Sequence, residues 1–98
     1  MGKVVYTKNE FMVIENSRGH VIINMDGKYQ NHGHIRKLST CKMLIGLIDK
    51  KVIPDSNYLR ETCLRICLDE KYIKEIENKI DKEKQKPKLI KVNKGVRK

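Results

Sequence analysis

The spacing of apolar residues changes near Ser39, and this change constrains the fold more than any other feature of the chain. Before it, residues 11–16 (FMVIEN) and 20–25 (HVIINM) are short apolar runs rich in strand-forming residues. After it, apolar residues recur at intervals of three and four, as they do on the buried face of a helix. We therefore expect an α+β domain in which a small antiparallel sheet precedes the helices.

Two turn signals divide the N-terminal part into strands. Ser17-Arg18-Gly19 separates the two apolar runs by three residues that include a glycine, which is typical of a β-hairpin. Asp26-Gly27 is a second turn signal, after which residues 28–35 are expected to return as a third strand. Residues 3–6 form a further candidate strand. The expected sheet is therefore a hairpin or a three-stranded sheet.

Three helices are expected to follow the sheet. Ser39 or Thr40 is expected to cap the first, Asp55 or Ser56 the second and Asp69 the third. The first helix is predicted to end near Lys51, because Pro54 restricts the residue before it to extended geometry. Pro87 is predicted to end the third helix.

Apolar stripes predict which face of each helix points into the core. The inward-facing residues are expected to be Met43, Leu44, Leu47 and Ile48 in the first helix, Leu59, Cys63, Ile66 and Cys67 in the second, and Ile73, Ile76 and Ile80 in the third. The three isoleucines of the third helix have a second interpretation, as the interface of a homodimer. Ile80 is the strongest candidate for that role, because a core position explains the other two equally well.

Positive charge is concentrated toward the C-terminus. The chain has 98 residues, with 22 Lys and Arg against 12 Asp and Glu, and a net charge of +10. Residues 82–98 contain eight of the basic residues and a single acid, Glu83. We expect one domain over residues 1–85 and a basic tail over residues 86–98 that is attracted to polyanions.

Composition argues against several classes of protein. No apolar run approaches the ~20 residues of a membrane span, and residues 1–10 lack the apolar stretch of a signal peptide. Three cysteines cannot all pair within one chain, which favours a reducing compartment. The expected location is the cytoplasm, with no membrane partner.

A polar cluster over residues 31–37 (NHGHIRK) lies just before the first helix. Its Asn and His side chains suit contacts with base edges, and its Arg and Lys suit contacts with phosphates. Arg18, at the hairpin tip, has the position of an arginine that enters a DNA groove. The predicted residues for binding duplex DNA are Arg18, His20, Lys28, Asn31, His32, His34, Arg36, Lys37 and Lys42. The alternative is a turn whose polar side chains bond their own backbone.

Metal binding and catalysis have weaker support. His32 and His34 lie two apart on an extended segment and so share a face, with His20 or Cys41 as a possible further ligand. No paired Cys-x-x-Cys, phosphate-binding loop or hydrolase nucleophile motif accompanies them. We expect no metal, no cofactor and no catalytic residue. Cys41, next to the basic cluster, is the cysteine to test for reactivity.

Four short motifs carry a resemblance to known proteins. They are His32-Gly33-His34, Ile53-Pro54, Tyr58-Leu59-Arg60 and Asp69-Glu70-Lys71-Tyr72-Ile73. This pattern resembles that of short lysine-rich proteins from phages and plasmids of Firmicutes. The size, charge and architecture are similar to those of the TcpK-like relaxosome accessory proteins of clostridial conjugative plasmids.

The resemblance implies a winged helix-turn-helix dimer that reads the origin of transfer through a β-wing. It makes the hairpin tip with His20 one wing candidate and the polar cluster over residues 31–37 the other, and it implies a relaxase or another transfer protein as a partner. The chain departs from the usual order of such domains, because its hairpin precedes the helices.

The function expected from the sequence is sequence-specific binding of duplex DNA by an accessory protein of a mobile element. The alternatives are a module that binds an acidic protein partner and a transcriptional regulator that binds a promoter. Duplex DNA is favoured over single strands and RNA, because four Tyr and one Phe provide few stacking surfaces.

Overall fold

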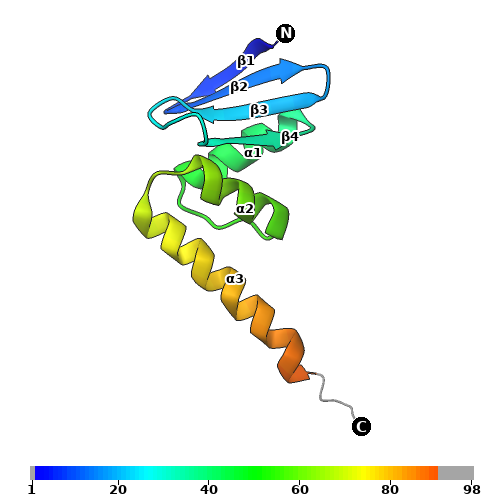
Figure 1. The fold of residues 1–98 in the computed structure, drawn as a ribbon, viewed down its shortest axis with the longest axis vertical. Helices are drawn as coiled ribbons and strands as arrows, with labels where there is room; N and C mark the ends of the chain where they lie inside the picture. The colour runs from blue at the N-terminus through cyan, green and yellow to red at the C-terminus, as the bar shows by residue number, and fades with distance from the viewer. Residues whose placement is uncertain (1, 91–98) are drawn as a thin grey trace.

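The computed structural model describes residues 2–90, with side chains described up to Glu83. It is an α+β domain, as predicted, in which a four-stranded antiparallel sheet of order β1-β2-β3-β4 precedes three helices (Figure 1). The strands are β1 (Lys3–Lys8), β2 (Phe11–Asn16), β3 (Gly19–Asn24) and β4 (His32–Ile35), and the helices are α1 (Leu38–Asp49), α2 (Asn57–Ile66) and α3 (Glu70–Ile90). The candidate strand at the N-terminus is real, so the sheet has four strands and not three.

The predicted hairpin is confirmed and joins β2 to β3. Asn16 pairs with Gly19 at its end, and the Asn16 Oδ1 atom accepts a hydrogen bond of 2.8 Å from the Arg18 backbone N–H. Gly19 has a φ of +136°, and a Cβ built there would lie 3.0 Å from the Cα atom of Arg36. Glycine is therefore required at this position both by the backbone and by the close approach of β4.

The strand predicted over residues 28–35 is half as long as expected, because residues 25–31 form a wide turn. Asn24 Oδ1 accepts a bond of 2.9 Å from the Asp26 N–H, and Asn31 Oδ1 accepts one of 2.8 Å from the Lys28 N–H. The Asn31 amide also donates a bond of 2.8 Å to the carbonyl of Arg65 in α2. These side-chain bonds to the backbone replace the expected sheet ladder.

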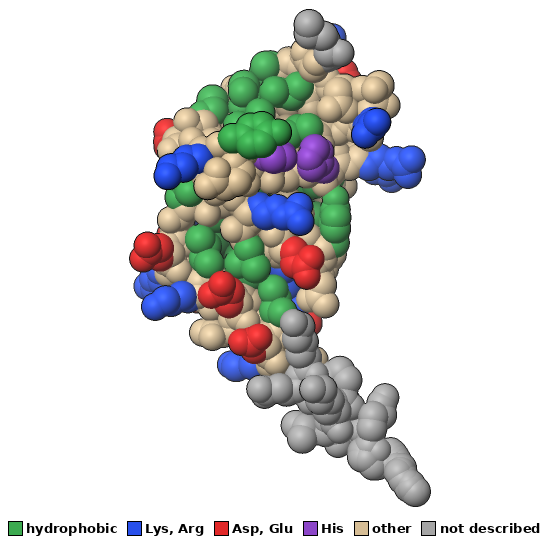
Figure 2. All heavy atoms as spheres, viewed as in Figure 1, with side chains coloured by type: hydrophobic (Ala, Val, Ile, Leu, Met, Phe, Trp, Pro, Cys, Tyr) green, Lys and Arg blue, Asp and Glu red, His purple; other side chains and the backbone are tan. Residues whose placement is uncertain are grey.

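Helices α1 and α2 cover one face of the sheet, and α3 packs on α2 and leads away from the sheet (Figure 1). On that face the buried strand residues are Phe11, Val13, Ile22 and Ile35. They belong to one core with the buried residues of α1 and α2. The alternate residues Met12, Ile14, Val21 and Ile23 are half-buried on the other face, against which none of the described helices packs. Hydrophobic side chains are accordingly visible over the sheet in Figure 2.

The structure corrects the start and the inward face of α1. The helix begins at Leu38, so Ser39 and Thr40 lie inside it, and the capping position is taken by Lys37 without a side-chain bond. Its buried residues are Cys41, Leu44, Ile45 and Ile48, whereas the side chain of Met43 is 49% exposed. The apolar stripe is wide enough for two orientations, and the one that places Cys41 and Ile45 against the sheet is adopted.

The predictions for α2 are confirmed. Ser56 caps it by accepting a bond from the Leu59 N–H, and the predicted inward face is buried. Asp69 caps α3 as predicted, accepting from the N–H groups of Lys71 and Tyr72. The end of α3 differs from the prediction, because the helix passes Pro87 and reaches Ile90. A proline inside a helix loses its own N–H bond and crowds the carbonyl four residues before it, which disfavours a helix without preventing the bonds of the other residues.

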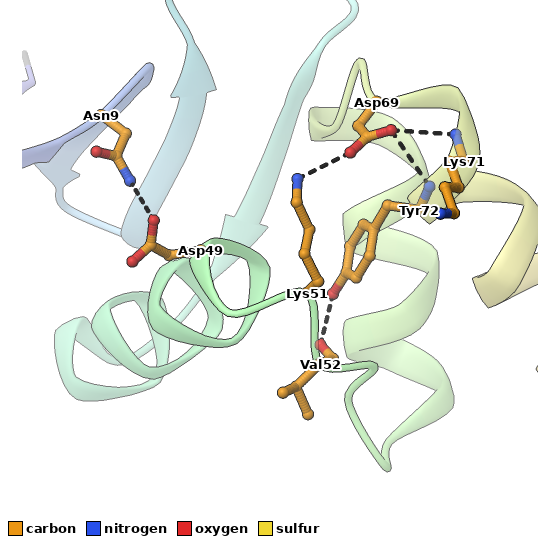
Figure 3. A network of polar contacts seen from close by, with 7 residues as sticks. All are labelled: Asn9, Asp49, Lys51, Val52, Asp69, Lys71 and Tyr72. Carbon is orange, nitrogen blue, oxygen red and sulfur yellow. Dashed lines mark hydrogen bonds and ion pairs between the residues drawn. The ribbon is translucent and has the colours of Figure 1, made fainter.

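A polar network ties the α1–α2 connection to the start of α3 (Figure 3). The Lys51 Nζ atom lies 2.8 Å from Asp69 Oδ2, and the Tyr72 hydroxyl donates a bond of 2.6 Å to the carbonyl of Val52. The hydrogen bond from Lys51 lowers the pKa of Asp69 below its usual value. Together these contacts fix the direction in which α3 leaves the body of the domain.

The isoleucines predicted for a dimer interface pack against the core of their own chain. Ile76 is fully buried and packs in the core with Tyr72, so its place in the interface prediction is wrong. Ile73 and Ile80 are half-buried and pack against the same core. A homodimer remains a prediction.

Candidate nucleic-acid interface

The hairpin tip and the end of β4 meet at one end of the sheet. The pairing of His20 with Ile35 places Arg36 beside the tip that carries Arg18. A cleft of about 320 Å³ lies between them. It is lined by Asn16, Arg18, His20, His34, Ile35, Arg36 and Tyr58. The structure therefore brings together four of the predicted DNA-binding residues, from segments far apart in the sequence. We call this feature the arginine cleft.

Hydrogen bonds to the backbone shape the cleft. The His20 Nδ1 atom lies 2.7 Å from the carbonyl of Arg36, which can only accept, so Nδ1 carries the proton. The Tyr58 hydroxyl donates to the carbonyl of His34. Both bonds hold the backbone at the end of β4, and one of them joins it to α2. The cleft is therefore built on two strands and a helix and not on a free loop.

The charge of the cleft is positive. The side chains of Arg18 and Arg36 are exposed, and neither forms a hydrogen bond or an ion pair with the described residues. None of the residues that line the cleft is acidic. A carboxylate outside this lining, that of Glu15, has its Oε2 atom 3.8 Å from His20 Nε2. Two guanidinium groups are thus available to an anionic ligand at one end of the sheet.

The other predicted residues lie outside the cleft. Lys28 and Asn31 belong to the turn at the opposite end of β3, where the amide of Asn31 is engaged by hydrogen bonds within the chain. Lys37 directly follows the cleft at the start of α1, whereas the Nζ atom of Lys42 lies 5.1 Å from the centre of the Tyr6 ring. Asn31 is therefore a structural residue in this fold.

His32 and His34 share one face of β4, as their spacing predicts, and this face is the open face of the sheet. Their ring centroids are 5.1 Å apart, and the Tyr29 ring lies 5.2 Å from that of His32. A second hollow, of about 240 Å³, is lined by these three rings together with Val21 and Ile23. Histidines lie beside hydrophobic side chains, with Lys or Arg nearby, in Figure 2. The sequence reasoning did not identify Tyr29, because its place depends on the wide turn before β4.

The structure also shows where the candidate metal ligands and the candidate reactive cysteine lie. Within residues 2–90, no group of three His, Cys, Asp or Glu side chains has an arrangement that could hold a metal ion. Cys41 does not face the polar cluster, because it is buried in α1 against the sheet. Burial raises the pKa of its thiol to about 11. The prediction that Cys41 is the cysteine to test for reactivity is therefore not supported by its position.

Native protein at pH 8 should react slowly or not at all with a thiol reagent such as Ellman's reagent. All three cysteines are buried, and the thiolate that reacts is disfavoured at Cys41 by its raised pKa. The measurement is the absorbance change with and without urea, and unfolding should release three thiols per chain. Rapid labelling of Cys41 in the native protein, located by peptide mass mapping, would contradict this placement.

Comparison with known proteins adds no assignment. No protein family, curated protein or solved structure matches the chain. The resemblance to relaxosome accessory proteins therefore stays a prediction. None of the helices in the described part of the chain is both long and apolar enough to cross a membrane.

Proposed function

We propose that the protein binds duplex DNA through the arginine cleft. The observation that carries this proposal is the pair of exposed guanidinium groups, Arg18 and Arg36, which flank a cleft without an acidic lining residue. A net charge of +10 adds a general attraction to the phosphate backbone. The fold supports this function in one further respect, because the tip is held by strand pairing and by Gly19.

The geometry suggests a division of roles between the two arginines. Arg18 lies at the tip of a hairpin, where its side chain can enter a groove and respond to groove width. Arg36 and Lys37 lie at the junction of β4 and α1, where contacts with phosphates would set the register of the protein on the duplex. The hairpin would thus serve as a wing, although it precedes the helices in the sequence.

The proposed biological setting is a mobile genetic element. In this proposal the protein is a cytoplasmic accessory protein that binds an origin of transfer as a homodimer, together with a relaxase or another transfer protein. It is supported by the resemblance in motifs, size and charge described above. No catalytic step is assigned to the protein in this role.

Arg18→Ala and Arg36→Ala should each weaken duplex binding about tenfold at near-physiological salt. Each should also reduce the slope of log affinity against log salt by about one if its guanidinium contacts a phosphate. The measurement is fluorescence anisotropy with a labelled 20-base-pair duplex. Lys50→Ala is the matched control, because it removes the same charge at the opposite end of the sheet, where α1 ends next to the β1–β2 turn.

Two results would contradict the proposal. If both arginine variants keep wild-type affinity while their unfolding curves are unchanged, the arginine cleft is not the DNA site. If selection from a random duplex library with excess competitor yields no motif, the binding is not sequence-specific. Recovery of a short motif would support specific recognition, and its location in the encoding element would distinguish an origin of transfer from a promoter.

A further inference from the structure

Three rings form a row on the open face of the sheet. Tyr29 is 90% exposed, and its ring is tilted against that of His32, which in turn meets His34 edge to face. A tyrosine this exposed adds little to stability through burial of its ring. We call Tyr29, His32 and His34 the ring row.

The central ring of the ring row, that of His32, is held by a bond to the backbone. The Nδ1 atom of His32 lies 2.7 Å from the carbonyl of Tyr29, so this ring nitrogen donates and its partner Nε2 is left without a proton when the ring is neutral. Asn31 anchors the same turn to α2 through the carbonyl of Arg65. The His32 ring and the backbone that carries Tyr29 are therefore held in place before any ligand arrives, which reduces the entropy cost of binding.

The ring row and the arginine cleft are continuous. His34 lines both hollows, with Tyr29 and His32 on one side of it and Arg18 and Arg36 on the other. A surface that places aromatic rings beside free guanidinium groups matches the two parts of a nucleotide, a base with a π-face and an anionic phosphate.

We propose that the ring row binds unpaired bases of a single-stranded nucleic acid by stacking, while a neighbouring phosphate lies in the arginine cleft. The proposal rests on the proposed function for the phosphate contact and extends it to a second ligand class. It reverses the expectation from composition, because three rings placed together provide a stacking surface that a count of Tyr and Phe does not reveal.

Charge favours a single-stranded nucleic acid over a second copy of the chain as the ligand of this face. Lys28 lies in the turn that carries Tyr29, and Arg36 follows His34 at the other end of the row. A two-fold copy packed on this face would bring groups of the same sign toward one another, because such interfaces pair identical surfaces. A polyanion would instead neutralise both ends.

The test is the affinity of the full chain for a labelled single strand of ten thymidines. Tyr29→Ala should weaken binding about tenfold, and Tyr29→Phe should stay within about twofold of wild type, because a base stacks on either ring. Gln30→Ala is the matched control, since it alters the exposed neighbouring side chain and removes no ring. Affinity for the 20-base-pair duplex should change by less than about twofold in all three variants.

A spectroscopic readout separates stacking from a purely structural effect. The chain has four tyrosines and no tryptophan, so its emission is tyrosine emission. Binding of the thymidine strand should quench that emission, and the quenching should be smaller in Tyr29→Phe. The salt dependence should be the same in Tyr29→Ala as in wild type, because stacking releases no counterions.

Two results would overturn the inference. The first is wild-type affinity of Tyr29→Ala for the thymidine strand. The second is a wild-type dimer in sedimentation velocity that Tyr29→Ala converts to a monomer, which would make the ring row a self-association surface. Failure of the arginine variants in the duplex assay, with the effect of Tyr29→Ala retained, would overturn the proposed function alone.

Discussion

Replacing Arg60 by alanine should lower the free energy of unfolding by about 3 kcal/mol. The Arg60 side chain is only 2% exposed. Its Nε–H donates a bond of 2.7 Å to the carbonyl of Pro54, and Nη1 donates one of 3.0 Å to Asn57 Oδ1. Nη1 and Nη2 donate bonds of 2.6 and 3.2 Å to the two carboxylate oxygens of Glu83. Alanine would remove all four bonds and leave a cavity between α2 and α3.

The size of the effect follows from where the two charges lie. The carboxylate of Glu83 is 43% exposed, so water can reach it in Arg60→Ala. The guanidinium group of Arg60 is buried, so Glu83→Gln, which leaves that charge without its carboxylate, should also be destabilising, but by less because the amide oxygen still accepts. Urea denaturation of both variants measures the difference.

Arg65→Ala provides the matched control for this prediction. Arg65 lies on the same helix and is exposed, so its replacement should change stability by less than about 0.5 kcal/mol. Equal stability of Arg60→Ala and Arg65→Ala would contradict a role for the Arg60–Glu83 pair in attaching α3.

The parts of the fold that sequence reasoning predicted are those that depend on neighbouring residues. Ser56 and Asp69 cap their helices through bonds that span two or three positions, and the Ser17-Arg18-Gly19 turn is equally local. The burial of Arg60 and its pairing with Glu83 were not predicted. A charged residue on a helix is usually exposed, and Glu83 lies 23 positions away in the sequence. Contacts of this kind are set by the tertiary structure and have no local signature.

In the candidate site, too, local features were predictable from the sequence and tertiary contacts were not. The histidine pair on β4 shares a face because side chains alternate along any strand. The meeting of Arg18 with Arg36 depends on the register between β3 and β4, and the position of Tyr29 depends on a turn closed by Asn31. The sequence pattern therefore identified most of the polar residues but not the surfaces that they form together.

Gly33→Ala should destabilise the protein by about 2 kcal/mol, because there is no space for a methyl group where β4 packs on α2. A Cβ at this position would lie 2.6 Å from the Cγ2 atom of Thr62 and 3.5 Å from that of Ile66. Thr62 cannot easily turn away, since it is β-branched and its hydroxyl donates a bond of 2.9 Å to the carbonyl of Tyr58. The strand or the helix must therefore shift.

A double variant tests this explanation. Thr62→Ser removes the Cγ2 atom and retains the hydroxyl, so it should relieve most of the clash caused by Gly33→Ala. The double variant should then be more stable than the sum of the single effects predicts, by about 1 kcal/mol or more in a double-mutant cycle. Strict additivity would contradict the clash. Because Gly33 lies between His32 and His34, Gly33→Ala should also weaken binding of the thymidine strand, and Thr62→Ser should restore that affinity together with the stability.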